Sequence, residues 1–124
     1  MLKLEMKTEL MKKKPEEISM ELIWHAGNSK SCAMEALTAA NNGDYDTAEK
    51  KQKEAGEEMK TAHQIQTDML HDFANGQEFN VDILMVHAQD HLNAAIMTMD
   101  FVKQMVKMTK EIQDLKEKIN MVQI

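Results

Sequence analysis

The stretch that decides the fold is VDILMVHAQDHLNAAIMTMDFVKQMVKMTKEIQDLKEKINMV, residues 81–122. Apolar residues recur along it at alternating steps of three and four, the spacing of one helix face. This stripe comprises Ile83, His87, Asp90, Ala94, Met97 or Thr98, Phe101, Met105, Met108, Ile112, Leu115 and Ile119. The pattern lasts for about five heptads with one stutter near Thr98. We expect one long helix whose stripe is too long for two shorter helices to cover, and therefore self-association. A monomeric bundle with a frayed helix end is the alternative.

Two shorter helices are expected before this one. Pro15 suits the first turn of a helix, and the acidic residues after it suit the positive end of the helix dipole. This helix should end at about Asn41, because Gly43 accepts the left-handed conformation past a helix end. Asp44 can then cap a second helix, which should run to about Phe73.

The remaining signals organise the chain around the long helix. Gly76 is the second stop, and Asn80 is a plausible N-cap for a helix that begins at about Val81. The first two helices are rich in alanine, so their backbones can approach closely. We expect an all-α, antiparallel up-down-up bundle over residues 15–124. Residues 1–14 have five lysines and two glutamates, and we expect them to form a mobile basic arm.

Composition excludes several classes of function. A net charge of −6 argues against nucleic acid or an anionic membrane as the main partner. All fifteen basic residues are lysine, so the planar guanidinium that often clamps phosphate is missing. Cys32 is single, which excludes an internal disulfide, and no apolar run has the length of a membrane span. We expect a soluble, cytoplasmic protein.

Three ionisable side chains share one face of the long helix: His87, Asp90 and His91. They could hold a metal with a third ligand, accept a phosphoryl group on a neutral imidazole, or form a polar layer that sets helix register. A zinc hydrolase is disfavoured, since Ala88 stands where the H-E-x-x-H motif has its glutamate. The chain has no glycine-rich loop, which fits a phosphoryl carrier better than a nucleotide-using kinase.

Motifs along the chain resemble those of a known family. HAQDHL at residues 87–92, NGDY at 42–45 and AHQIQT at 62–67 resemble the lactose/cellobiose-type enzyme IIA components of the bacterial phosphoenolpyruvate-dependent sugar phosphotransferase system. AGNSKS at 26–31 is similar to a small-residue segment of the family's first helix, although the family often has arginine at Lys30. The family commonly has methionine at Asn93. The likeness extends over nearly the whole chain from Ile18 onward.

This resemblance implies a phosphocarrier, and so a transferase component of sugar transport that becomes a phosphoprotein. It would take a phosphoryl group from HPr onto His87 and pass it to a cysteine of a IIB component, with membrane IIC as an indirect partner. The family forms homotrimers, which implies a nine-helix assembly through the long third helix. The substrate would be a β-disaccharide of the cellobiose/chitobiose type or lactose, with cellobiose slightly favoured.

The resemblance also implies a metal. The family's aspartate at the Asp90 position points to the threefold axis, where three copies can hold one divalent cation such as Mg²⁺. Three converging carboxylates would repel one another without a cation or protons, which gives this role a physical motive. Hard oxygen ligands suit Mg²⁺.

Three further residues are possible supporting groups. His91 lies one turn after His87, where a hydrogen-bond donor to the phosphoryl group and a structural role fit equally well. His63 would lie near the cleft by resemblance, although a surface or core position is the simpler expectation. Gln89 falls on a different helix face from His87, so within one subunit it should not touch the phosphoryl group. The remaining histidines, His25 and His71, are expected to be structural.

Two rival functions stay open. A two-component histidine phosphotransfer domain is also a small helical carrier, but such domains have a lysine soon after the active histidine. Here none follows His87 until Lys103. A coiled-coil scaffold without chemistry is the other rival.

Overall fold

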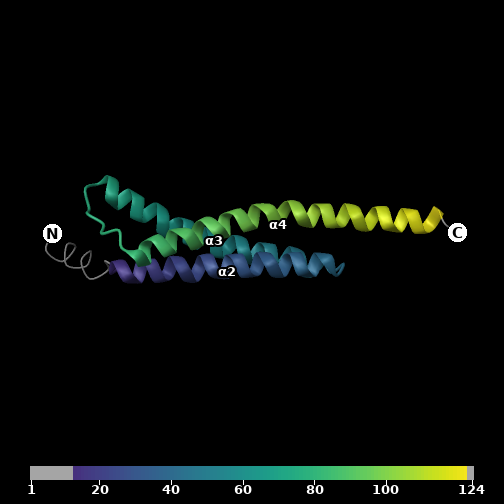
Figure 1. The fold of residues 1–124 in the computed structure, drawn as a ribbon, viewed down its shortest axis with the longest axis horizontal. Coiled ribbons are helices and arrows are strands. Elements are labelled where there is room, and N and C mark those ends of the chain that lie inside the picture. Colours follow the sequence, from purple (N-terminus) through teal and green to yellow (C-terminus); the bar gives the residue numbers. More distant parts are fainter. Residues whose placement is uncertain (1–12, 123–124) are drawn as a thin grey trace, which may run out of the picture.

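The structure is a computed structural model that describes residues 13–122. Over these residues it consists of three helices, α2 (Pro15–Asn41), α3 (Tyr45–Ala74) and α4 (Ile83–Val122) (Figure 1). Helices α2 and α4 run in the same direction and α3 runs against them, which confirms the predicted all-α, up-down-up order. Most of the predicted basic arm, residues 1–12, lies outside the described residues.

Local chemistry sets most helix ends where the sequence predicts them. Pro15 occupies the first turn of α2, and Gly43 leaves that helix with a positive φ of 78°. The side chain of Asp44 accepts a hydrogen bond from the backbone N–H of Thr47 at 3.1 Å, so it caps α3 as expected. Gly76 follows the end of α3 with a φ of 95°.

The start of α4 differs from the prediction, because Asp82 caps the helix in place of Asn80. A side-chain oxygen of Asp82 accepts a hydrogen bond from the backbone N–H of Met85 at 2.9 Å. Its carbonyl accepts another from Val86 at 3.1 Å. Aspartate and asparagine both cap helices well, so spacing alone did not distinguish the two positions.

The core is formed of small side chains centred on α2. Its buried residues recur every three or four positions: Ser19, Leu22, Ala26, Ser29, Ala33, Ala36 and Ala40. Small residues at a helix contact allow close approach of the backbones. The buried hydroxyl of Ser29 donates to the carbonyl of Ala55 in α3 at 2.8 Å and lies 3.0 Å from the sulfur of Met99 in α4. Helix α2 therefore joins the other two helices.

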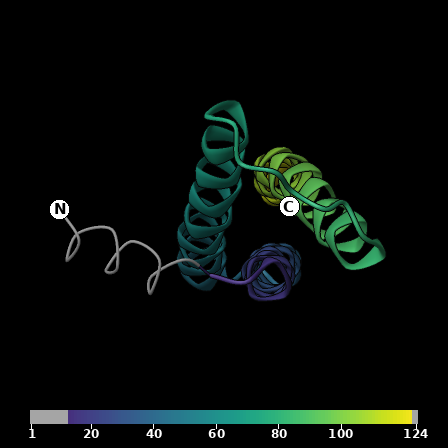
Figure 2. The same ribbon diagram turned by 90° about the vertical axis from the view of Figure 1, so that its left-hand side faces the viewer.

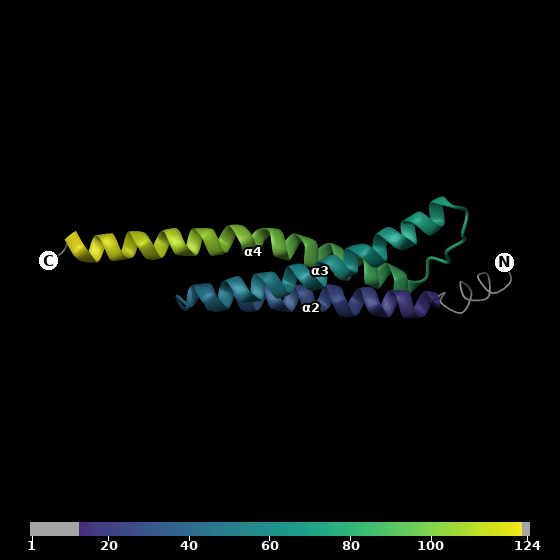
Figure 3. The same cartoon turned by 180° about the vertical axis from the view of Figure 1, so that it is seen from behind.

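Helices α3 and α4 diverge towards the linker that joins them, and at the opposite end α4 is the longer of the two. Figure 2 shows α3 leaning away from α4 towards the linker between them. At the opposite end α4 projects past α2 and α3 (Figure 3). The Thr109 hydroxyl lies 3.5 Å from the Asn41 side chain, and the Lys110 ammonium lies 5.9 Å from the centre of the Tyr45 ring. Beyond these contacts every residue from Glu111 to Val122 is exposed, and we call residues 111–122 the overhang.

Helix α4 has two apolar faces. One face packs into the core of the chain through Met85, Ala88, Leu92, Ala95 and Val102. The stripe singled out in the sequence lies on the other face, and most of its residues are exposed. Ile83 is 89% exposed, Phe101 57% and Leu115 58%. The predicted self-association therefore has an uncovered apolar surface on which to occur. No helix within residues 13–122 is long and apolar enough to cross a membrane.

Candidate functional site

His87 and His91 form a contact pair on the surface of α4, which we call the histidine pair. Their Nε2 atoms lie 3.1 Å apart, and their rings meet edge to face with centroids 4.5 Å apart and planes at 88°. His87 is exposed and His91 is half-buried. A hydrogen bond at this distance needs one nitrogen with a proton and one without. At least one ring of the pair is therefore neutral, the form in which imidazole is a nucleophile.

Asp90 lies on the exposed stripe and not in the histidine pair. Its side chain makes no hydrogen bond or ion pair with any of residues 13–122. Its carboxylate is the donor type that Mg²⁺ prefers, but one carboxylate fills only part of an octahedral shell. Within the described chain, no group of three or more histidine, cysteine, aspartate or glutamate side chains could hold a metal ion. A metal site built around Asp90 therefore needs ligands from outside these residues or from water.

Gln89 is committed to the interface with α3. Its side-chain amide donates to the side-chain carbonyl of Gln66 at 2.7 Å and lies 3.6 Å from the sulfur of Met85. Gln89 thus faces away from His87, which agrees with the face predicted for it. Its partner Gln66 was not among the residues predicted for the site. The signal was present, because Gln66 belongs to the AHQIQT segment that the resemblance had singled out.

The other histidines lie apart from the pair. His63 is exposed on α3, and its side chain makes no hydrogen bond or ion pair within residues 13–122. His25 is held by Glu58 across the α2–α3 interface, with 2.7 Å between Nδ1 and Oε2. His71 lies 3.1 Å from the side-chain amide of Asn75 at the end of α3. The last two contacts agree with structural roles.

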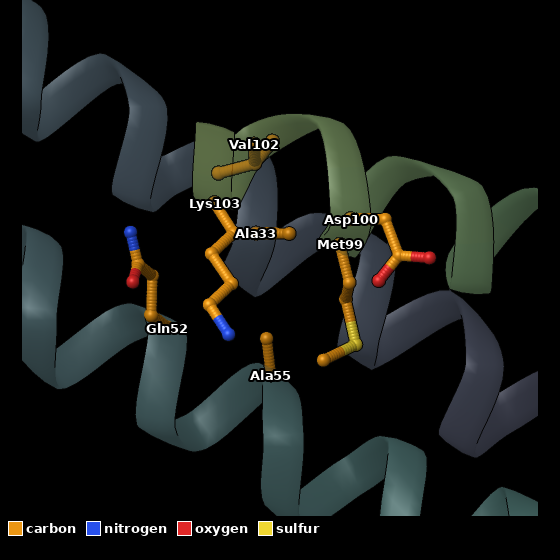
Figure 4. Close-up of a pocket in the computed structure, with 7 residues that line it drawn as sticks. All are labelled: Ala33, Gln52, Ala55, Met99, Asp100, Val102 and Lys103. Carbon is orange, nitrogen blue, oxygen red and sulfur yellow. The ribbon is translucent and has the colours of Figure 1, made fainter. Parts of the chain in front are cut away.

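A groove of about 320 Å³ lies further along the bundle and is separate from the histidine pair. Figure 4 shows its lining: Ala33, Gln52, Ala55, Met99, Asp100, Val102 and Lys103. Lys103 extends into this space towards α3 (Figure 4). It follows His87 by sixteen residues, about 24 Å along the helix at about 1.5 Å per residue. The lysine expected close to the active histidine of a two-component phosphotransfer domain is therefore absent from the described site.

Cys32 does not supply a second nucleophile. Its sulfur is half-buried and lies 4.0 Å from a carboxylate oxygen of Glu54. Burial raises the pKa of the Cys32 thiol, and the negative charge of Glu54 raises the pKa further. The reactive thiolate is therefore disfavoured at this position.

Comparison with known proteins decides the family. Residues 17–110 match the family model described as "PTS system, Lactose/Cellobiose specific IIA subunit". The chain belongs to this family. It is therefore a IIA component, a phosphotransferase component of the sugar phosphotransferase system, as the motifs predicted. The matched region ends where the overhang begins.

Relatives resemble the IIA component over most of their length. It is 38% identical over 104 residues to the lichenan-specific phosphotransferase enzyme IIA component of Bacillus subtilis, covering 84% of this chain and 94% of the relative. It is also 38% identical over 106 residues to the lactose-specific EIIA component of Lacticaseibacillus casei, covering 83% and 95%. The crystal structure of the cellobiose-specific enzyme IIA from Bacillus anthracis superposes with a TM-score of 0.80 at 32% identity, covering 86% and 97%. The chitobiose IIA in complex with HPr from Escherichia coli shares the fold, with a TM-score of 0.69 at 24% identity.

Proposed function

We propose that this IIA component carries a phosphoryl group on His87, taken from HPr and passed to a cysteine of a IIB component in the cytoplasm. The observation that supports this most directly is the exposed His87 ring with its Nε2 atom 3.1 Å from Nε2 of His91. A carrier needs an accessible nucleophile that two partners can reach in turn. An open helix surface meets that requirement better than a deep pocket does.

The proposed reaction is a displacement at phosphorus. The lone pair on Nε2 of neutral His87 forms a nitrogen–phosphorus bond while the bond to the donor imidazole of HPr breaks, and the donor ring keeps that electron pair. In the second transfer a thiolate of IIB forms the sulfur–phosphorus bond, and His87 leaves with its electron pair. Such transfers depend mainly on positioning and charge stabilisation.

His91 is the positioning residue in this proposal. When its Nε2–H donates to Nε2 of His87, it keeps the lone pair and not the proton on that nitrogen, and this hydrogen bond breaks as Nε2 attacks phosphorus. After transfer, the same N–H can donate to a phosphoryl oxygen. The chain contains no arginine, so this donor matters more than it would in a site with a guanidinium group.

We further propose that three copies assemble through the exposed stripe of α4 from Asp90 to Ile119, with their α4 helices parallel and His87 outside the contact. The uncovered apolar residues include Met97, Phe101, Met105, Met108, Ile112, Leu115 and Ile119. A continuous apolar stripe of this length is typical of an association surface. Asp90 lies on the same stripe, so three copies would meet at the axis and could hold one Mg²⁺ ion. The ion would neutralise carboxylates that otherwise repel one another.

Relatives of this chain are named for several different sugars. The relatives are named for lichenan, lactose, galactose, cellobiose and oligo-β-mannoside transport. All of these except galactose are β-linked saccharides, and the IIA component itself handles only the phosphoryl group. We propose a β-disaccharide of the cellobiose type.

Intact mass measurement tests the carrier function. After incubation with phosphoenolpyruvate, enzyme I and HPr, the wild-type chain should gain the mass of one acid-labile phosphoryl group. His87→Ala should gain none, whereas His63→Ala should gain one, since that histidine lies outside the pair. A wild-type chain that stays unmodified would contradict the proposal and favour a scaffold without chemistry.

A further inference from the structure

The separation of the two Nε2 atoms in the histidine pair also suits a shared metal ion. Zinc–imidazole bonds are about 2.0–2.1 Å long, so two nitrogens at about 90–109° around one ion lie about 2.8–3.4 Å apart. The observed 3.1 Å falls within that interval. We propose that His87 and His91 form a two-ligand site for a borderline transition-metal dication such as Zn²⁺, and that metal bound there blocks phosphorylation of His87.

The ligand chemistry separates this site from the Mg²⁺ proposed at Asp90. Neutral imidazole suits zinc, copper and nickel, whereas Mg²⁺ prefers hard oxygen donors. To bind the metal through both Nε2 atoms, the ring that donates must move its proton from Nε2 to Nδ1, so that both Nε2 lone pairs are free. The negative charge of Asp90, within one turn of both rings, attracts a dication to this part of the helix.

The proposed site should bind metal weakly, because it has few protein ligands and lies on an exposed surface. Within residues 13–122 no third histidine, cysteine or carboxylate joins the pair, so the rest of the coordination shell comes from water or from outside these residues. Structural zinc sites use four protein ligands, and catalytic sites usually use three. A two-ligand site on an exposed helix surface should therefore exchange its metal readily. Ready exchange suits a reversible block of the pair rather than a permanent cofactor.

The block follows from the electron pair on His87. One Nε2 lone pair can bind zinc or phosphorus, but not both. This consequence rests on the proposed function of His87 as the phosphoryl acceptor. Metal binding itself does not, so the two parts have separate tests.

Calorimetric titration of the full chain tests metal binding. Zinc chloride should bind wild-type protein and His63→Asn alike, because His63 is an exposed histidine outside the pair. His91→Asn removes one of the two ligands. Loss of a residue that only hydrogen-bonds a metal ligand lowers metal affinity by about 10- to 100-fold, so loss of a ligand itself should lower the affinity for zinc by at least this factor. Magnesium chloride should show no dependence on His91. Equal zinc affinity in wild-type protein and His91→Asn would overturn the site.

Phosphorylation kinetics test the block. Purified phospho-HPr serves as donor, so zinc cannot act through enzyme I. Zinc should slow the phosphorylation of His87 in the wild-type chain, and a chelator should restore the rate. In His91→Asn, the ratio of the rates with and without zinc should be closer to one than in wild type. Unchanged loading of zinc-saturated wild-type protein would overturn the block. Failure to load in zinc-free buffer would instead contradict the proposed function and leave the calorimetric result standing.

Discussion

The side-chain amide of Gln89 donates a 2.7 Å hydrogen bond to the side chain of Gln66 and so ties the turn that contains His87 to α3. Positions two apart on a helix point to nearly opposite sides. One turn of α4 therefore holds the bundle together with Gln89 and leaves His87 open to partners. The two roles can be separated by mutation.

We expect Gln89→Ala to lower the free energy of unfolding by about 1 kcal/mol, the typical net contribution of one hydrogen bond. Phosphoryl loading of His87 should be nearly unchanged. A double-mutant cycle with Gln66→Ala, measured by urea denaturation at one protein concentration, should show coupling between the two positions. Loss of loading without loss of stability would contradict a structural role for Gln89.

His91→Ala should slow loading of His87. A hydrogen bond to a charged group contributes about 1.5–3 kcal/mol, which corresponds to about 10- to 150-fold in rate. The loss should appear in the rate constant at saturating phospho-HPr and not in its apparent affinity. His91→Gln keeps an N–H donor and should recover part of the rate. Equal rates for the alanine and glutamine variants would argue against donation by His91.

Asp90→Asn should abolish magnesium binding, since it removes the charge that three copies would direct at the axis. Chelation should weaken assembly of wild-type protein, because the carboxylates are then left to repel, but should not affect the variant. Calorimetry and light scattering measure the two effects. Asp100→Asn is the matched control, an exposed aspartate of α4 that lies off the stripe. Magnesium binding equal to wild type in Asp90→Asn would rule out the axial role.

The overhang should contribute to assembly but not to the fold of the chain. Burying a leucine side chain contributes about 1.5–3 kcal/mol, so Leu115→Asn should weaken association at least about tenfold. Glu117→Gln, on the opposite face of the same segment, is the control. Sedimentation across a dilution series gives the association constants, and circular dichroism checks helix content. Identical sedimentation of Leu115→Asn and wild type would show that the overhang is not an interface.

Asp44 should make stability depend on pH. Hydrogen bonds from the side chain and backbone of Thr47 lower the pKa of Asp44 below its ordinary value of 3.8. The carboxylate therefore stabilises the fold above pH 3.8, and this contribution is lost as pH falls through the lower folded-state value. Wild-type protein should melt at a higher temperature than Asp44→Ala at pH 7, and this difference in melting temperature should decrease below pH 4. A constant difference would show that charge plays no part in this cap.

Local signals predicted the helices well because helix ends depend on neighbouring residues. Pro15, Gly43 and Asp44 act within one turn of their own positions, and each acts in the structure as expected. The N-cap predicted for α4 was wrong because Asn80 and Asp82 are both residues that can cap a helix. The choice between them depends on where Met85 enters the core, which is a tertiary contact.

The histidine pair was predicted as a shared face but not as a contact. Helical spacing places His87 and His91 side by side, whereas their 3.1 Å approach depends on the rotamers of both rings. The hydrogen bond between Gln66 and Gln89 depends on how α3 lies against α4, about which a sequence pattern of either helix says nothing. Asp90 as a metal ligand stays a prediction, because its partners would come from other copies.

The length of α4 separates the histidine pair from the overhang. His87 and Leu115 lie twenty-eight residues apart on an unbroken helix, about 42 Å at about 1.5 Å per residue. A fluorophore placed on an outward-facing residue of the overhang can therefore report subunit exchange in real time while phosphoryl traffic proceeds undisturbed at the far end.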